Sequence, residues 1–129
     1  MAKILILSTA HDAMGETGKK TGVWYEELAT PYYAFTDAGH DVHVATLDGS
    51  AIPIDPNSDE TGADAPESVT RVRGDDAAQS ALNAPAKLSD FTPESVDAVY
   101  IPGGHGAMWD LAESDALAAF LRDAWEAGK

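Results

Sequence analysis

The sequence predicts a doubly wound α/β fold, in which a parallel sheet carries helices on both faces. Three short apolar runs alternate with segments of helical periodicity, which is the element order of this fold. The first run, ILIL at residues 4–7, is apolar without interruption, as expected for a strand that is buried on both faces. Ligands gather at the carboxyl ends of parallel strands, which here are residues 8–11, 46–48 and 102–106.

Strands are expected at residues 4–7, 42–46 and 98–101. We expect them to be parallel and adjacent, because consecutive strand–helix units usually neighbour one another in a sheet. The stretch at residues 47–66 contains three prolines and many small polar residues, so it is predicted to be a loop. The TPE sequence at residues 92–94 predicts one short helical turn with a cap residue and a Pro at its first position.

Three helices are expected between and after the strands. Apolar residues recur at helical spacing over residues 23–35, where Gly39 is a natural stop and Pro31 should kink or split the helix. A second helix is expected at residues 75–83, and a third begins after the cap residue Ser114. One face of the third helix is formed by Leu117, Phe120, Leu121, Ala124 and Trp125. The aromatic residues expected in the core are Trp24, Tyr32, Tyr33 and Trp125.

The composition limits the class of protein and its partners. The 129 residues suffice for one modest domain, and the formal net charge of −14 should repel nucleic acid and anionic lipid. The absence of Cys excludes disulfides, thiolate metal sites and a Cys nucleophile within the sequence. The apolar start is too short for a signal peptide or a membrane span, so we expect a cytoplasmic protein without a nucleic-acid or membrane partner.

The most specific local motif is IPGGHGAMWDL at residues 101–111, directly after the third predicted strand. Paired glycines allow a tight turn and bring backbone N–H groups close to a ligand. Such N–H groups at Gly103 and Gly104 can hold an oxyanion, although a tight strand-to-helix connection without a ligand has the same pattern. His105 either lines a pocket or is a loop residue that merely follows the turn. The motif matches neither a phosphate P-loop nor a dinucleotide fingerprint.

A second motif, TGVWYEELATPY at residues 21–32, places two adjacent carboxylates on the first helix. Their side chains point about 100° apart, so Glu26 and Glu27 cannot share one environment. Glu27 lies one turn after Val23 and three residues after Trp24, on the more apolar side of the helix. A carboxyl group buried in such a setting has a raised pKa and can shuttle a proton, which makes Glu27 the acid–base candidate. The alternative is an exposed helix carboxylate, the commoner state of Glu.

A third motif, IPIDPNS at residues 52–58, predicts a rigid turn in which Asp55 and Ser58 bond the backbone, and which could also form a pocket wall. His11, at the carboxyl end of the first strand, could contact a metal or a substrate. Three suitable metal ligands are not visible in the sequence, so we expect no metal site. The two histidines that flank the second strand are expected to be solvated or packed.

In this order the three motifs resemble the DJ-1/PfpI superfamily, in particular its branch of glutathione-independent glyoxalases and holding chaperones. The resemblance runs from Lys3 to Lys129, and PGGHGAMWDL is its most specific part. It implies a flavodoxin-like sandwich and a nucleophilic Cys on a strand-to-helix elbow, followed by a His. It also implies that Glu27 bonds that Cys and exchanges protons with the substrate. The backbone of Gly103 and Gly104 would help to form an oxyanion hole, and no dissociable cofactor would be needed.

The resemblance further implies that residues 1–129 are the N-terminal portion of one domain. In the superfamily the Cys-His pair follows the Gly-Lys with which this sequence ends, so we expect the pair on a complementary chain, in a homo- or hetero-oligomer. The implied activity is that of a glyoxalase III-like lyase or hydrolase, which converts methylglyoxal or a similar small carbonyl substrate to a 2-hydroxy acid. Two alternatives stay open: a non-catalytic chaperone-like or binding protein, and an amidase or peptidase.

Overall fold

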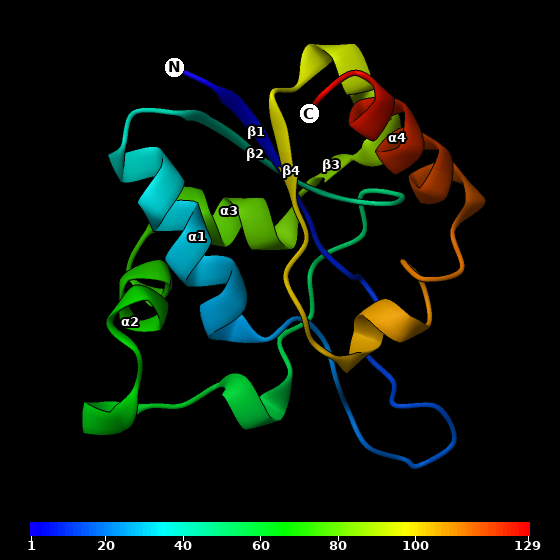
Figure 1. Ribbon diagram of the computed structural model, residues 1–129. Coiled ribbons are helices and arrows are strands. Elements are labelled where there is room, and N and C mark those ends of the chain that lie inside the picture. Colours follow the sequence, from blue (N-terminus) through cyan, green and yellow to red (C-terminus); the bar gives the residue numbers. More distant parts are fainter.

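A parallel four-stranded sheet forms the centre of the protein, which a computed structural model describes over residues 1–129 (Figure 1). The strands lie in the order β3-β2-β1-β4, and their bounds are β1 Lys3–Leu7, β2 Asp41–Thr46, β3 Ala86–Lys87 and β4 Ala98–Tyr100. Leu5 of β1 lies opposite His43 of β2 and Val99 of β4. The three predicted strands are therefore parallel, as expected, and β1 lies between the other two.

Four α-helices cover the two faces of this sheet: α1 Tyr25–Asp37, α2 Glu67–Arg73, α3 Asp76–Asn83 and α4 Asp115–Glu126. In Figure 1, α1, α2 and α3 lie on one side of the strands and α4 lies on the other. None of the helices is long and apolar enough to cross a membrane.

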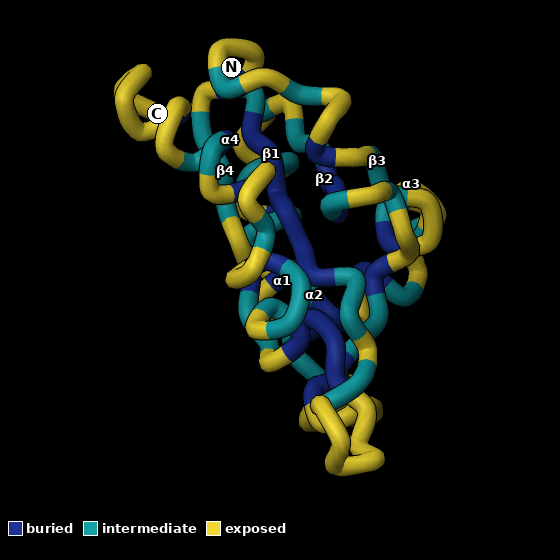
Figure 2. Tube along the Cα trace, turned by 90° about the vertical axis from the view of Figure 1, so that its right-hand side faces the viewer, coloured by how far each residue is buried: buried dark blue, intermediate teal, exposed yellow.

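The core consists of two clusters, one on each face of the sheet, because successive side chains of a strand point to opposite faces. Ile6 of β1 packs with buried apolar residues of α1, α2 and α3, whereas Leu5 and Leu7 pack with Leu117 and Phe120 of α4. Figure 2 shows that β1 is buried over most of its length. These contacts confirm a doubly wound, flavodoxin-like α/β fold.

The strand order places a topological switch between β1 and β4. From β1 the chain continues to β2 and β3 on one side, and it then returns to β4 on the other side of β1. In open α/β sheets, ligands bind outside the carboxyl ends of the strands at such a switch. The loops after β1 and β4 are therefore the expected place of a site. Directly after β2 the chain passes beside β3, where a Cβ at Gly49 would lie 3.0 Å from the Lys87 side chain.

Two elements, β3 and α2, are absent from the sequence prediction. β3 has two residues, and α2 contains the β-branched residues Val69, Thr70 and Val72, whose helix propensity is low. Burial of Val69 and Val72 stabilises α2 instead. The predicted helix at residues 75–83 and the predicted turn at residues 92–94 are both present. Asp75 caps α3, and Thr92 caps a single turn of 3-10 helix at Pro93–Ser95.

Pro31 does not split α1, which is continuous from Tyr25 to Asp37. Because Pro has no N–H, the carbonyl oxygen of Glu27 loses its partner four residues further on. Buried side chains before and after Pro31, including Leu28 and Tyr33, hold the helix against the sheet and compensate for this loss. The helix ends as predicted, with Gly39 in the left-handed region at φ 87°.

The apolar face of α4 is only partly covered. Phe120 and Ala124 are buried as expected, but Trp125 is 80% exposed, so its prediction as a core residue is wrong. Trp125 borders a hollow of about 260 Å³ beside β4, which is the last strand on this side of the sheet. No further strand therefore lies beyond β4 to cover the indole ring. Among the other aromatic residues expected in the core, Tyr33 is buried and Trp24 and Tyr32 are partly buried.

Candidate functional site

Glu27 and Gly103 form a contact between the first turn of α1 and the loop after β4. The N–H of Gly103 donates to Oε1 of Glu27 at 3.1 Å, and the carbonyl oxygen of Gly103 accepts from the N–H of Trp24 at 2.8 Å. A Cβ at Gly103 would lie 2.9 Å from the same carboxylate oxygen, so a larger residue would displace the Glu27 side chain. The structure thus brings the acid–base candidate together with the first of the paired glycines.

The expected burial of Glu27 is wrong, because the residue is exposed. Apolar neighbours on the same helix do not bury a side chain unless a second element lies over it. Glu27 instead borders an open hollow of about 310 Å³, to which Trp24 and Tyr100 also contribute. Burial, and then the negative charge of Glu27, raise the pKa of Tyr100. The bond from Gly103 is the one hydrogen bond that the Glu27 carboxylate accepts within the chain, so Oε2 can meet another group.

The two glycines of the motif have different surroundings. A Cβ at Gly104 would lie 2.7 Å from the carbonyl oxygen of Gly22, so this position requires Gly. Whereas the N–H of Gly103 is bound to Glu27, the N–H of Gly104 has no acceptor within the chain. A backbone N–H without an internal acceptor is the kind of donor that an oxyanion hole uses. Of the two glycines, Gly104 therefore provides the donor that is unpaired within the chain.

The start of α1 is also held by the third motif, which forms the predicted rigid connector. The N–H of Val23 donates to the carbonyl oxygen of Pro53 at 2.8 Å, and the N–H of Asp55 donates to the carbonyl oxygen of Val23 at 2.9 Å. A Cβ at Gly22 would lie only 2.3 Å from the Pro53 carbonyl oxygen. The backbone at residues 22–24 is thus enclosed between the connector and the paired glycines.

Asp110 joins the loops after β1 and β4, and sequence reasoning missed it. Its carboxylate accepts from the Thr9 hydroxyl and from the Ala10 N–H, each at 2.8 Å. Beside this pair, the His11 ring stacks on Trp109 with 5.2 Å between ring centroids. The available signal was an Asp in the Gly motif and a Thr at the end of β1, since a parallel topology places both at the same edge of the sheet.

The histidines contribute less to the site. His105 begins a 3-10 turn, is exposed, and makes no side-chain hydrogen bond, so its role as a pocket residue stays a prediction. No group of three or more His, Asp or Glu side chains is placed to hold a metal ion. His40 accepts from the N–H of Ala2, and His43 packs edge-on against Phe91, which agrees with the packed roles expected for both.

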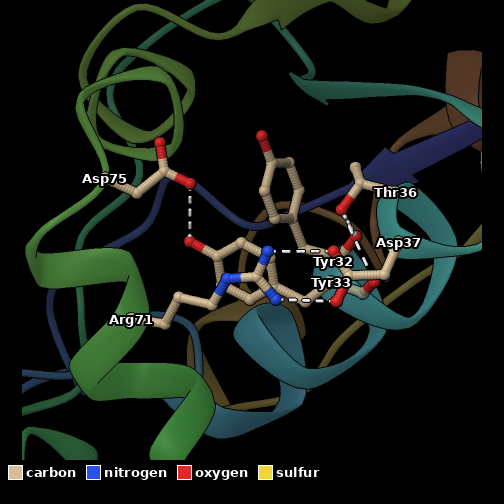
Figure 3. Close-up of polar contacts among 6 residues, drawn as sticks. All are labelled: Tyr32, Tyr33, Thr36, Asp37, Arg71 and Asp75. Carbon is tan, nitrogen blue, oxygen red and sulfur yellow. Dashed lines mark hydrogen bonds and ion pairs between the residues drawn. The ribbon is translucent and has the colours of Figure 1, made fainter.

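A second polar group, here called the α1–α3 cluster, joins α1, α2 and the start of α3 and consists of Tyr32, Tyr33, Thr36, Asp37, Arg71 and Asp75 (Figure 3). Arg71 binds both carboxylate oxygens of Asp37, at 2.7 and 2.9 Å, and its guanidinium lies 3.8 Å from the centre of the Tyr33 ring. The Tyr33 hydroxyl donates to Asp75 at 2.8 Å. Asp75 in turn accepts from two backbone N–H groups at the start of α3.

These contacts shift the pKa values within the α1–α3 cluster. Burial, followed by the hydrogen bond to Asp75, raises the pKa of Tyr33. The hydrogen bonds from Arg71 lower the pKa of Asp37, and the bond from Tyr33 lowers the pKa of Asp75. The cluster therefore favours a neutral Tyr33 between two ionised carboxylates.

Comparison with known proteins places the chain in a family. The model of the DJ-1/PfpI family matches residues 20–129, and the chain belongs to this family. It is 31% identical over 126 residues to hsp3102 of Schizosaccharomyces pombe, which is named a glutathione-independent glyoxalase. The aligned part is 97% of this chain and 52% of that protein, so the chain spans about half the length of this relative.

Solved structures give the same picture. The Rapid Encystment Protein 24 KDa of Francisella tularensis matches with a TM-score of 0.87 at 32% identity, over 98% of this chain and 55% of that one. Glyoxalase III from Candida albicans matches with a TM-score of 0.82 at 24% identity, over 98% of this chain and 54% of that one. At this low identity, the likeness to the Candida albicans protein is a likeness of the fold alone.

Proposed function

We propose that this chain supplies the acid–base group and the oxyanion donor of a glyoxalase III-like enzyme, which acts on methylglyoxal or a similar 2-oxoaldehyde. The observation that carries this proposal is the Glu27 carboxylate on the N–H of Gly103, next to the free N–H of Gly104. Sequence identity to a protein named a glyoxalase supports it.

The nucleophile is assigned to a Cys on a complementary chain, because this chain has none. The thiolate adds to the aldehyde carbon of methylglyoxal, and the N–H of Gly104 stabilises the oxyanion until it is protonated to a hemithioacetal. Glu27 then takes the proton from this carbon and returns it to the neighbouring carbon, which yields a 2-hydroxy thioester. Water hydrolyses the thioester, releases lactate and restores the thiol.

The surroundings of Glu27 suit this role. The bond from Gly103 fixes Oε1, while Oε2 remains open to move a proton. The hollow of about 310 Å³ beside Glu27 provides room for a small carbonyl compound and for the group that attacks it. The reaction requires no dissociable cofactor, since the thiol and the carboxylate perform each step.

We assign the complementary chain to the outer side of β4. An edge strand presents N–H and C=O groups that a further strand can pair with. The hollow beside β4 is lined mainly by apolar side chains and ends at the exposed ring of Trp125. A strand with an apolar face would pair with β4 and cover the indole.

Exposed apolar side chains favour a second candidate function, the binding of unfolded or apolar segments of other proteins. Met108 and Trp125 are 61% and 80% exposed, and Ile101 is 38% exposed. A large apolar side chain that is exposed on the surface can contact an apolar segment of another protein. Suppression of client aggregation by this chain, without turnover under any condition, would favour this function over the enzyme.

The test of the enzymatic proposal is reconstitution. The purified chain is assayed for methylglyoxal consumption and lactate formation, alone and with a second polypeptide that carries the Cys-His elbow. We expect no turnover from the chain alone and measurable turnover with the second polypeptide, but none when its Cys is replaced by Ser. Robust turnover by the Cys-free chain alone would show that the assigned chemistry is wrong.

A further inference from the structure

The helix that carries Glu27 is not capped by its own sequence. Trp24 occupies the N-cap position of α1, and its side chain makes no capping hydrogen bond. The first N–H groups of a helix need acceptors from outside the helix. The N–H of Tyr25, the first residue of α1, donates to Oγ of Ser58 at 3.0 Å, across 33 residues of sequence. The cap of this helix therefore comes from a different loop.

Asp55 organises that loop from a buried position. The residue is 1% exposed, and its carboxylate accepts from the Thr21 hydroxyl at 3.0 Å and from the Asn57 N–H at 2.9 Å. Its backbone carbonyl accepts from the Ser58 hydroxyl at 2.8 Å, which turns the Ser58 lone pairs towards Tyr25. Burial of a carboxylate among neutral donors is unfavourable, so its presence indicates a specific task for these bonds.

The same network reaches Glu27 through the backbone. Val23 is bonded on both sides to the connector at residues 53–55, and the next N–H, that of Trp24, donates to the carbonyl oxygen of Gly103. Gly103 returns its own N–H to Glu27. The connector and the paired glycines therefore meet at the start of α1, and the position of this turn determines where the Glu27 carboxylate lies.

We propose that Asp55 is a positioning residue for Glu27 and acts through Ser58 and the first turn of α1. Its relevance to catalysis rests on the proposed function, because it acts on the group assigned to move the proton. Loss of Ser58 removes the acceptor of the Tyr25 N–H. Loss of the Asp55 carboxylate removes the bonds to Thr21 and Asn57 that hold Ser58 in place. In either case the first turn of α1 frays. The Glu27 carboxylate then leaves the N–H of Gly103.

The amide resonance of Gly103 reports this contact in the chain alone, without any activity. In a ¹H–¹⁵N NMR titration its shift should follow the ionisation of Glu27, and Glu27→Gln should abolish the pH-dependent shift. The other titratable groups at the hollow are Glu26 and Tyr100. Glu26→Gln should preserve the response, and Tyr100 ionises in a different pH range.

Three variants test the network. Asp55→Ala and Ser58→Ala should each lose the pH-dependent shift of Gly103. Asp55→Asn should retain it, because the amide has the same shape and the Thr21 hydroxyl can reverse to accept from it. Ser58→Ala removes a single oxygen, so it tests the network even if Asp55→Ala does not fold.

Asp75→Ala is the matched control, since Asp75 is also an N-cap carboxylate that bonds two backbone N–H groups, but on α3. This variant should lower the stability of the fold and leave the Gly103 response unchanged. The proposal is overturned if Ser58→Ala retains the Gly103 response, or if Asp75→Ala loses it to the same extent.

Turnover separates this proposal from the proposed function. In the reconstituted enzyme, Asp55→Ala should lower kcat with little change in KM, and Asp55→Asn should restore kcat. A reconstituted enzyme without turnover, whose Gly103 amide responds as expected, would contradict the proposed function and leave the positioning role of Asp55 intact.

Discussion

Helix α1 takes part in two polar regions, and they differ in how fully their groups are bonded. In the α1–α3 cluster, Asp37 has both oxygens bound by Arg71, and Asp75 accepts from Tyr33 and from two backbone N–H groups. At the other end of the helix, Glu27 accepts a single hydrogen bond and the N–H of Gly104 has no acceptor. The cluster therefore holds three helices together, whereas the region around Glu27 keeps bonding capacity for a ligand.

The largest effect on stability is expected where the Glu27 region is most crowded. Gly22→Ala should lower the free energy of unfolding by about 3 kcal/mol, because the new Cβ would lie 2.3 Å from the Pro53 carbonyl oxygen. Gly74→Ala is the matched control, since the nearest atom to its Cβ is 3.9 Å away. Urea unfolding monitored by circular dichroism measures both. Equal losses in the two variants would contradict the crowded position of Gly22.

A smaller loss is expected in the α1–α3 cluster. Tyr33→Phe should cost about 1 kcal/mol, because it removes the hydrogen bond to Asp75. The Tyr32 hydroxyl makes no hydrogen bond, so Tyr32→Phe should cost less (Figure 3).

Tyr33→Phe should also change how the free energy of unfolding depends on pH. The pKa of Tyr33 is raised above its ordinary value of 10.0, so the neutral form is favoured in the fold. Its contribution to stability is present below pH 10 and is lost as the pH rises further. As the pH rises above 10, the free energy of unfolding of Tyr33→Phe should therefore fall less steeply than that of the wild type. If the free energy of unfolding falls equally steeply above pH 10 in both proteins, Tyr33 does not contribute to this pH dependence.

The smallest effect is expected from the exposed carboxylate of Asp37. Its pKa is lowered from the ordinary 3.8, so its stabilising contribution is present at neutral pH and is lost as the pH falls below that value. Asp37→Asn should flatten the acid limb of a plot of unfolding free energy against pH. Asp123→Asn, whose carboxylate meets only the adjacent Arg122 at 3.4 Å, should leave the acid limb unchanged. Identical acid limbs in wild type and Asp37→Asn would contradict the expected effect.

The sequence predicts the elements that depend on local pattern. The apolar runs locate β1, β2 and β4, and the cap residue Ser114 locates the start of α4. The sequence does not predict helix α2, because its residues have a low local helix propensity. The helix is stabilised instead by the burial of Val69 and Val72.

The site is predicted only in part, because its geometry is tertiary. Glu27 and Gly103 are 76 residues apart, and the resemblance rather than any local pattern connects them. The exposure of Glu27 depends on which elements lie over α1, and helical periodicity carries no such information. The same limit conceals the bond from Asp110 to Thr9 and the cap that Ser58 provides for α1.

The assignment of Glu27 as the group that moves the proton is tested most directly by comparing it with the adjacent carboxylate of Glu26. In the reconstituted enzyme, Glu27→Gln should lower kcat at least about 100-fold, as expected for loss of a general acid–base group. Glu26→Gln should leave kcat nearly unchanged, and both variants should retain the wild-type free energy of unfolding. Equal kcat values for the two variants would contradict the assignment of Glu27 as the group that moves the proton.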